Sequence, residues 1–368
     1  MKIDSLVNLA RRIKYSPGVR RLRARLFPPP AVPQQAAVGA DADYAQRMAK
    51  EEAHFRDVVD VNDLPQIFHY WSHNYVRPLL EEFGVSHPHQ FFAKYLAESA
   101  RVQGIDDPVF ISLGAGNCDT EVHVARIMRD AGMANFTIEC LDMNPTMLER
   151  GRAMAAAEGV AEHVVPAIGD FNAWRADKPY AGVMVNQALH HMLKLEDTFD
   201  EIRRCLAKGG YFVTSDMIGR NGHQRWPEAL AAVREFWKEL PPAYRYNRPL
   251  RRQEDQFMDW DCSMEGFEGI RAQDILPLLL PRFHFPVFIA FANVVDPFVD
   301  RSFGHNFDAD AAWDRELIDR IHAYDEAGLK AGTLTPTHML AVMSVAAPAE
   351  EKCARGLTPR MSLRRTDA

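Results

Sequence analysis

The chain has 368 residues, with 47% hydrophobic and 25% charged side chains, which fits one large globular domain or a domain with additions. Its formal net charge of −7 argues against general nucleic-acid binding, and its five cysteines form no Cys-x-x-Cys pair that would indicate structural zinc. Because no apolar run reaches the roughly 18 residues of a membrane span, we expect a cytoplasmic protein.

The first segment, residues 1–43, joins a basic stretch to a proline-rich linker. In residues 1–26, lysine and arginine are opposed by a single acid, Asp4, and apolar residues recur with the period of one helix face. A basic amphipathic helix can pack on its own domain, and it can also make peripheral contact with the inner face of a membrane or with a protein. The sequence leaves these alternatives open.

Residues 44–105 are predicted to form helices that precede the first strand. Within them, Trp71 and Tyr75 are four positions apart and therefore share one helix face. They either pack this helix against the core or contact a bound ligand. We therefore regard Trp71 and Tyr75 as candidate substrate contacts.

The stretch 109–128 is typical of a buried strand, a tight turn with Gly114 and Gly116, and a helix. Glycine lets the backbone approach a ligand closely, and a helix N-terminus offers free N–H groups. A dinucleotide fingerprint needs a third glycine where the chain has Asp119, and that acid, together with Glu121, would repel a pyrophosphate. A cofactor with a cationic amino-acid end would tolerate both acids.

Four further strand-like runs follow and alternate with helical stretches, which predicts a mainly parallel sheet with helices on both faces. Ligands of such sheets bind at the carboxyl ends of the strands. The candidate ligand-binding residues at these ends are Asp142 and Met143, Asp170 and Phe171, and Asn186 and Gln187.

This order of motifs, densest from residue 106 to residue 219, resembles that of the class I S-adenosylmethionine-dependent methyltransferases. The resemblance implies that Gly114, Ala115 and Gly116 form the glycine loop around S-adenosylmethionine. Asp142 would bind the ribose, Asp170 the adenine amino group with Phe171 beside the base, and Asn186 and Gln187 would line the methyl-transfer site. The implied fold is an α/β, Rossmann-like sheet of seven strands, the last one antiparallel between the fifth and sixth.

The sequence departs from the family pattern at two positions. Ser112 stands where an acid is common, and Cys118 stands where a third glycine is common. The first departure puts one contact to the amino end of the cofactor in doubt, and Glu121 or Asp119 could replace it.

The organisation implied for the rest of the chain has five parts after the N-terminal segment. The lid at 44–105 is followed by the cofactor-binding core at 106–220, a helical cap insertion at 221–281, and the C-terminal part of the core sheet at 282–345. The tail, 346–368, has little apolar content, and we expect it to be disordered.

Methyl transfer requires alignment of the acceptor and, for an oxygen acceptor, removal of its proton, for which histidine is suited near neutral pH. His191 is the favoured base and His190 the second candidate, because both follow the fourth strand. His305 and Asn306, in a glycine-containing loop, are weaker candidates for substrate contact. Metal-assisted relatives place acids after strand four, where this chain has Asn186-Gln187, so we predict no metal.

The resulting hypothesis is O-methylation of a small molecule, such as a glycan, a glycolipid or a natural product. N- or C-methylation of a small molecule is the alternative within the same enzyme class. An NAD(P)-dependent oxidoreductase and a non-catalytic binding module are the alternatives of other classes. The missing third glycine disfavours the oxidoreductase, and the intact Gly114, Gly116, Asp142 and Asp170 disfavour the module.

Overall fold

The computed structural model describes residues 44 and 47, residues 63–264 and residues 266–364. The basic stretch and the proline-rich linker of residues 1–43 lie outside the described residues, so their predicted helix and contacts stay predictions. None of the described helices is both long enough and apolar enough to cross a membrane.

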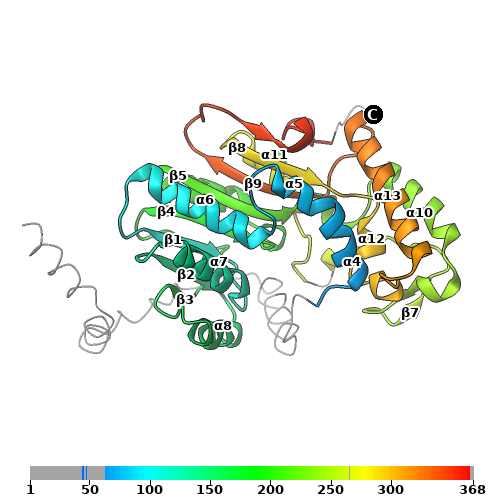
Figure 1. The fold of residues 1–368 in the computed structure, drawn as a ribbon, viewed down its shortest axis with the longest axis horizontal. Coiled ribbons are helices and arrows are strands. Elements are labelled where there is room, and N and C mark those ends of the chain that lie inside the picture. The colour runs from blue at the N-terminus through cyan, green and yellow to red at the C-terminus, as the bar shows by residue number, and fades with distance from the viewer. Residues whose placement is uncertain (1–43, 45–46, 48–62, 265, 365–368) are drawn as a thin grey trace, which may run out of the picture. The chain divides into compact units, whose positions relative to one another are not determined.

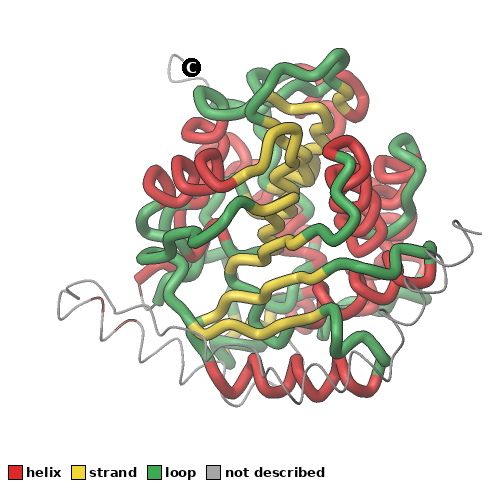
Figure 2. The backbone as a smooth tube through the Cα atoms, turned by 90° about the vertical axis from the view of Figure 1, so that its left-hand side faces the viewer, coloured by secondary structure: helices red, strands yellow, loops and turns green. Residues whose placement is uncertain are grey.

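An eight-stranded sheet forms the central layer, with helices on both sides (Figures 1 and 2). The strand order is β10-β8-β9-β5-β4-β1-β2-β3. The strands are β1 Val109–Leu113, β2 Thr137–Asp142, β3 Val164–Ile168, β4 Tyr180–Asn186, β5 Leu206–Met217, β8 His284–Phe291, β9 His338–Ser344 and β10 Lys352–Cys353. Only β9 runs antiparallel to its neighbours, β5 and β8, as the sequence predicts for the last strand of this fold. The predicted number of seven strands is wrong by one, because β10 pairs in parallel with β8.

Two apolar layers cover the faces of the sheet. On one face lie α6 Pro88–Gln103, α7 Asp119–Asp130 and α8 Pro145–Ala157, and on the other α9 Leu195–Cys205 and α11 Ala272–Leu279. Helix α11 falls inside the segment predicted to be a cap insertion, but Ile275, Leu276 and Leu279 are buried among the residues of the second layer. The end of that segment therefore belongs to the core of the sheet.

A third apolar cluster gathers helices from distant parts of the sequence. Helix α5 Arg77–Glu81 is not among them, because its Leu79 and Leu80 are buried in the first apolar layer. The helices of the third cluster are α4 Gln66–Trp71, a π-helical turn Ser72–Val76, α10 Pro227–Glu239, α12 Asp296–Val299 and α13 Ala312–Ala331. We call this cluster the helical cap. A small hairpin, β6 Tyr246–Asn247 with β7 Arg252–Gln253, lies in the loop after α10. Short 3₁₀ turns lie at Leu189–His191, Asn221–His223, Pro242–Arg245, Cys262–Met264, Gly304–Asn306 and Ala354–Gly356.

The C-terminal tail is ordered where the structure describes it, so the prediction of disorder is wrong for residues 346–364. It lies along β8 at the edge of the sheet (Figure 1). Ala354 and Leu357 are buried, and Arg355 donates a hydrogen bond to the carbonyl of Ala290 in β8. A few apolar side chains suffice here, because the sheet already offers an unpaired edge to dock on.

Candidate active site

The carboxyl ends of β1 and β2 meet at the glycine turn. The Gly114 N–H donates a hydrogen bond to the Leu141 carbonyl at 2.8 Å, and Gly114 and Gly116 adopt φ values of +73° and +53°. A Cβ at Gly114 would lie 2.6 Å from the Cβ of Ala188, so no larger residue fits there. The predicted turn is present. Its backbone conformation favours glycine at both positions, and the close approach of Ala188 leaves no space for a side chain at Gly114.

Asp142 ends β2 directly beside this turn. Its carboxylate accepts hydrogen bonds from the N–H groups of Gly116, at 2.9 Å, and Asn144, at 2.8 Å. Burial raises the pKa of the Asp142 carboxyl, and these hydrogen bonds counteract part of the rise. Each oxygen keeps a lone pair, so the carboxylate can still accept hydrogen bonds from ribose hydroxyls.

Glu121, in the first turn of α7, reaches the serine that replaces the expected acid. Ser112 Oγ donates a hydrogen bond to Glu121 Oε1 at 2.6 Å. The other carboxylate oxygen, Oε2, is buried and has no hydrogen-bond partner among the described residues. Burial raises the pKa of Glu121 to about 7. A buried acid that lacks a donor is suited to the cationic amino group of S-adenosylmethionine.

Asp170, after β3, is held by a tyrosine from the N-terminal part of the chain. Tyr44 donates a hydrogen bond from its hydroxyl to Asp170 Oδ2 at 2.6 Å, and the Asn172 N–H bonds Oδ1 at 2.8 Å. Burial first and the Asp170 contact second raise the pKa of the Tyr44 hydroxyl. Phe171 is buried and packs beside Gly114. A residue of the segment predicted to be a lid therefore contacts the carboxylate that the family resemblance assigns to the adenine.

The other predicted cofactor contacts lie at the same edge of the sheet. Met143 is half-buried against the second apolar layer. Asn186 donates a side-chain hydrogen bond to Thr120 Oγ1 at 2.9 Å, which joins β4 to the start of α7. Gln187 is exposed at a φ of +52°, and its N–H donates to the carbonyl of Ser215 at 2.8 Å.

Asp216 fixes the turn that carries both candidate bases. It is fully buried near the carboxyl end of β5, and its Oδ2 accepts the N–H groups of Ala188 and Leu189 at 2.9 and 2.8 Å. Its Oδ1 lies 2.7 Å from Nδ1 of His190. Burial alone would lower the pKa of His190, but the charge and hydrogen bond of Asp216 outweigh it and raise the pKa to about 10.

Glu268 gathers three histidines around one carboxylate. Its oxygens lie 3.4 Å from Nε2 of His190, 3.6 Å from Nε2 of His191 and 2.5 Å from Nε2 of His223. Burial would raise the pKa of Glu268, but the charge of His191 and hydrogen bonds from His190 and His223 hold it well below its usual range. We call His190, His191, His223 and Glu268 the histidine cluster.

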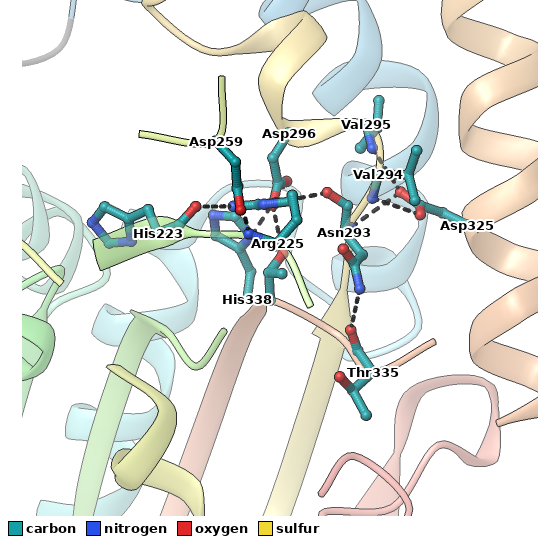
Figure 3. A network of polar contacts seen from close by, with 11 residues as sticks. His223, Arg225, Asp259, Asn293, Val294, Val295, Asp296, Asp325, Thr335 and His338 are labelled. Atoms are coloured by element: carbon teal, nitrogen blue, oxygen red, sulfur yellow. Dashed lines mark hydrogen bonds and ion pairs between the residues drawn. The ribbon is translucent and has the colours of Figure 1, made fainter. Parts of the chain in front are cut away.

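A buried polar network is connected to the cluster through His223 (Figure 3). Arg225, 5% exposed, donates a hydrogen bond to the carbonyl of His223 at 2.8 Å and pairs with Asp296 at 2.6 Å. Asp325 of α13 accepts hydrogen bonds from three consecutive N–H groups, those of residues 293–295. The loop of His223 is thereby anchored to the segment that begins α12 and to α13.

The predicted substrate contacts are engaged elsewhere. Trp71 is 3% exposed within the helical cap, and Tyr75 donates a hydrogen bond to Asp319 of α13 at 2.7 Å. Asn306 donates from its amide to the carbonyls of Tyr244 and Tyr246. His305 accepts a hydrogen bond at its carbonyl from Arg248. These contacts place the four residues in the helical cap and in the loops beside it.

Four residues of the site were not predicted from the sequence: Tyr44, Asp216, His223 and Glu268. Asp216 follows the same rule as Asp142, an acid at the carboxyl end of a parallel strand, and that rule would have found it. The others come from the lid and from loops, and no spacing in the sequence connects them.

Comparison with known proteins gives one family match and several distant structural likenesses. Residues 111–210 match a family model described as a methyltransferase domain. No curated protein matches the chain. Among solved structures, the chain is similar to a geranyl diphosphate C-methyltransferase from Streptomyces coelicolor A3(2), at 11% identity and a TM-score of 0.39, covering 70% of this chain and 79% of that one. It is also similar to a SAM-dependent methyltransferase from Geobacter sulfurreducens, at 13% identity and a TM-score of 0.37, covering 69% and 91%. Likenesses this distant say nothing about the acceptor.

The strand order, the glycine turn and the acid that ends β2 define a class I methyltransferase fold, and the matched domain spans β1 to the start of β5. Residues 111–210 therefore carry a methyltransferase domain, for which the expected cofactor is S-adenosylmethionine. The residues of the site fit that cofactor. The glycine turn at 114–116 lets the backbone come close to it. Glu121 offers a buried acceptor for its amino group, and Asp142 offers a carboxylate for its ribose.

Proposed function

We propose that the protein transfers the methyl group of S-adenosylmethionine to a hydroxyl group of a small molecule, such as a glycan, a glycolipid or a natural product. The position of His191 carries this proposal. The His191 N–H donates a hydrogen bond to the carbonyl of Ala188 at 3.2 Å, and the Cβ of Ala188 lies against Gly114 of the glycine turn. On its other side, His191 lies 3.6 Å from Glu268. It therefore stands between the cofactor residues and the loop of Glu268.

The bound cofactor supplies an electrophilic methyl group in line with its carbon–sulfur bond. The chain must then hold the acceptor oxygen on that line and take up its proton. His191 suits the second task, because imidazole accepts protons near neutral pH and the Glu268 carboxylate stabilises the resulting charge. His190 is less suited, since its Nδ1 is already tied to the buried Asp216.

The net charge of −7 supports a small-molecule acceptor over a nucleic acid. The carboxyl edge of the sheet is flanked by loops that the helical cap anchors, which suits a confined acceptor site. Residues 1–26 remain the candidate for peripheral contact with a membrane or a protein.

The His191→Gln variant tests the proposal. We expect kcat with a hydroxyl acceptor to fall by about 10²–10⁴-fold, the usual contribution of a positioned proton acceptor, while the affinity for S-adenosylmethionine is unchanged. Turnover is followed by transfer of a labelled methyl group, and cofactor affinity by calorimetry. His284→Gln, at an exposed histidine that begins β8, is the matched control and should retain both. Undiminished turnover in His191→Gln would refute the role of His191, and a product methylated at nitrogen or carbon would refute O-methylation.

A further inference from the structure

We propose that the histidine cluster is a binding site for a divalent transition-metal ion of the Zn²⁺ type, held by His190, His191 and Glu268. One nitrogen of each histidine and one carboxylate oxygen all lie within 4.8 Å of one another. Two imidazoles and one carboxylate are ligands that such ions prefer. The inference deepens the proposed function, and it rests on that function only for the part the ion plays in methyl transfer.

Two of the distances between candidate ligand atoms are close to those of a tetrahedral centre, although they involve different oxygens of Glu268. With bonds of about 2.0–2.1 Å, two ligands of tetrahedral zinc lie about 3.4 Å apart. In the structure, the Nε2 atoms of His190 and His191 lie 3.4 and 3.6 Å from the two oxygens of Glu268. One ion can therefore reach all three groups after small side-chain movements.

The support behind one ligand is also of the kind that metal sites use. A metal-binding histidine usually donates its other ring N–H to a carboxylate, which fixes the tautomer and the ring orientation. His190 has this partner, because its Nδ1 lies 2.7 Å from Oδ1 of the fully buried Asp216. Asp216 is fixed in turn by two backbone N–H groups. These hydrogen bonds fix the ring of His190 with its Nε2 directed toward Glu268.

His223 is assigned to the second layer. Its Nε2 lies 2.5 Å from Oε1 of Glu268, which is a hydrogen-bond distance and too short for two ligands of one tetrahedral ion. Its loop meets the loop of Glu268 where the Gly222 N–H donates to the Gly269 carbonyl at 2.9 Å. His223 would therefore orient the carboxylate, and an ion held by the other three residues would keep a fourth position open, as in catalytic zinc sites.

An open position on the ion has a direct chemical use here. A hydroxyl oxygen bound to a divalent cation loses its proton more readily, because the cation stabilises the negative charge that forms. With the ion bound, His191 would be one of its ligands, and the proton of the acceptor would pass to solvent instead of to His191. In the metal-free protein, His191 takes up that proton itself. The prediction that no metal binds rested on Asn186 and Gln187, and neither belongs to the histidine cluster.

The test is direct metal binding to the full-length protein after removal of bound metal with a chelator. Co²⁺ serves as the spectroscopic probe and Zn²⁺ as its competitor. We expect one equivalent of Co²⁺ to bind with the intense visible absorption of a tetrahedral site, and Zn²⁺ to displace it. Glu268→Gln and His190→Ala should weaken binding at least a hundredfold, whereas His284→Ala should bind as the wild type does. Circular dichroism and calorimetry with S-adenosylmethionine identify any variant that fails to fold, and Glu268→Gln preserves shape in case His190→Ala does fail.

The outcomes separate this inference from the proposed function. Binding of Co²⁺ to the wild type that is no tighter than to Glu268→Gln would overturn the metal site, and methyl transfer by the same preparation would leave the proposed function intact. Tight binding that depends on Glu268, without transfer to any hydroxyl acceptor, would establish the site and overturn the proposed function.

Discussion

Glu121 is a buried acid whose ionisation should govern cofactor binding. Its pKa is raised to about 7 by burial, to which the nearby charges of Asp119 and Asp142 add, while the hydrogen bond from Ser112 opposes the shift. A free carboxyl of this kind is largely protonated at pH 6 and largely ionised at pH 8. Only the ionised form attracts the cationic amino group of the cofactor, so binding below pH 7 must also release a proton.

We therefore expect the affinity for S-adenosylmethionine to rise about tenfold between pH 6 and pH 8 in the wild type. Glu121→Gln should bind more weakly at pH 8 and show little change over this range. Calorimetry at both pH values measures the effect, and the variant is its own control because it retains every other titrating group. A wild-type affinity that is flat from pH 6 to pH 8 would contradict the assignment of Glu121 to the amino group.

Ser112 and Glu121 also show how far the cofactor site could be predicted from the sequence. The missing acid at Ser112 was visible in the sequence, and so were the two nearby candidates to replace it. Choosing between them required the side-chain geometry, because only the structure shows the Ser112 hydroxyl bonded to Glu121.

Helix α8 illustrates the same point at the scale of an element. Its Gly151 lies in the helix interior, where alanine is normally preferred by about 1 kcal/mol. A Cβ there would lie 2.7 Å from the carbonyl oxygen of Asn117 and 2.8 Å from Sγ of Cys118. Cys118 itself adopts a φ of +57°, so the residue that replaces the family's third glycine takes a glycine-like conformation. Gly151 provides the space in which the cysteine side chain fits.

Gly151→Ala should therefore destabilise the protein by about 1–2 kcal/mol, because the clash with a backbone carbonyl outweighs the gain in helix propensity. It should also weaken cofactor binding, since Asn117 and Cys118 belong to the turn that follows Gly116. Urea unfolding and calorimetry measure the two effects. Ala156→Gly, at an exposed position of the same helix, should cost about 1 kcal/mol and leave cofactor binding unchanged. A Gly151→Ala variant more stable than the wild type would show that α8 is not held this closely.

The sheet was predictable because its information is local. Each buried strand is a short apolar run, and each cofactor residue at its end stands a fixed distance after that run, as Asp142 does after β2. The acceptor side of the site was not predictable in this way. Glu268 meets His190 and His191 only because α11 packs on the sheet and carries the loop before it to the carboxyl end of β4. A single sequence contains no pattern that predicts this contact between Glu268 and the two histidines.

At the scale of the whole molecule, the C-terminal tail connects the sheet to the helical cap. Arg355 bonds the Ala290 carbonyl of β8 and pairs with Glu326 of α13. Arg364 pairs with Glu228 of α10 and lies 4.2 Å from the ring of Trp226. Low apolar content predicted disorder, but the tail needs little apolar area because it joins surfaces that are already formed.

Substitution of Leu357 tests whether docking of the tail stabilises the folded protein. It is 7% exposed and belongs to the apolar layer that contains α9 and α11, so Leu357→Ala should cost about 2–3 kcal/mol of unfolding free energy. Met361 is 57% exposed in the same tail, and Met361→Ala should change stability by no more than about 0.5 kcal/mol. Chemical denaturation of both variants gives the difference. If Leu357→Ala unfolds at the same denaturant concentration as Met361→Ala, the tail does not contribute to the folded core.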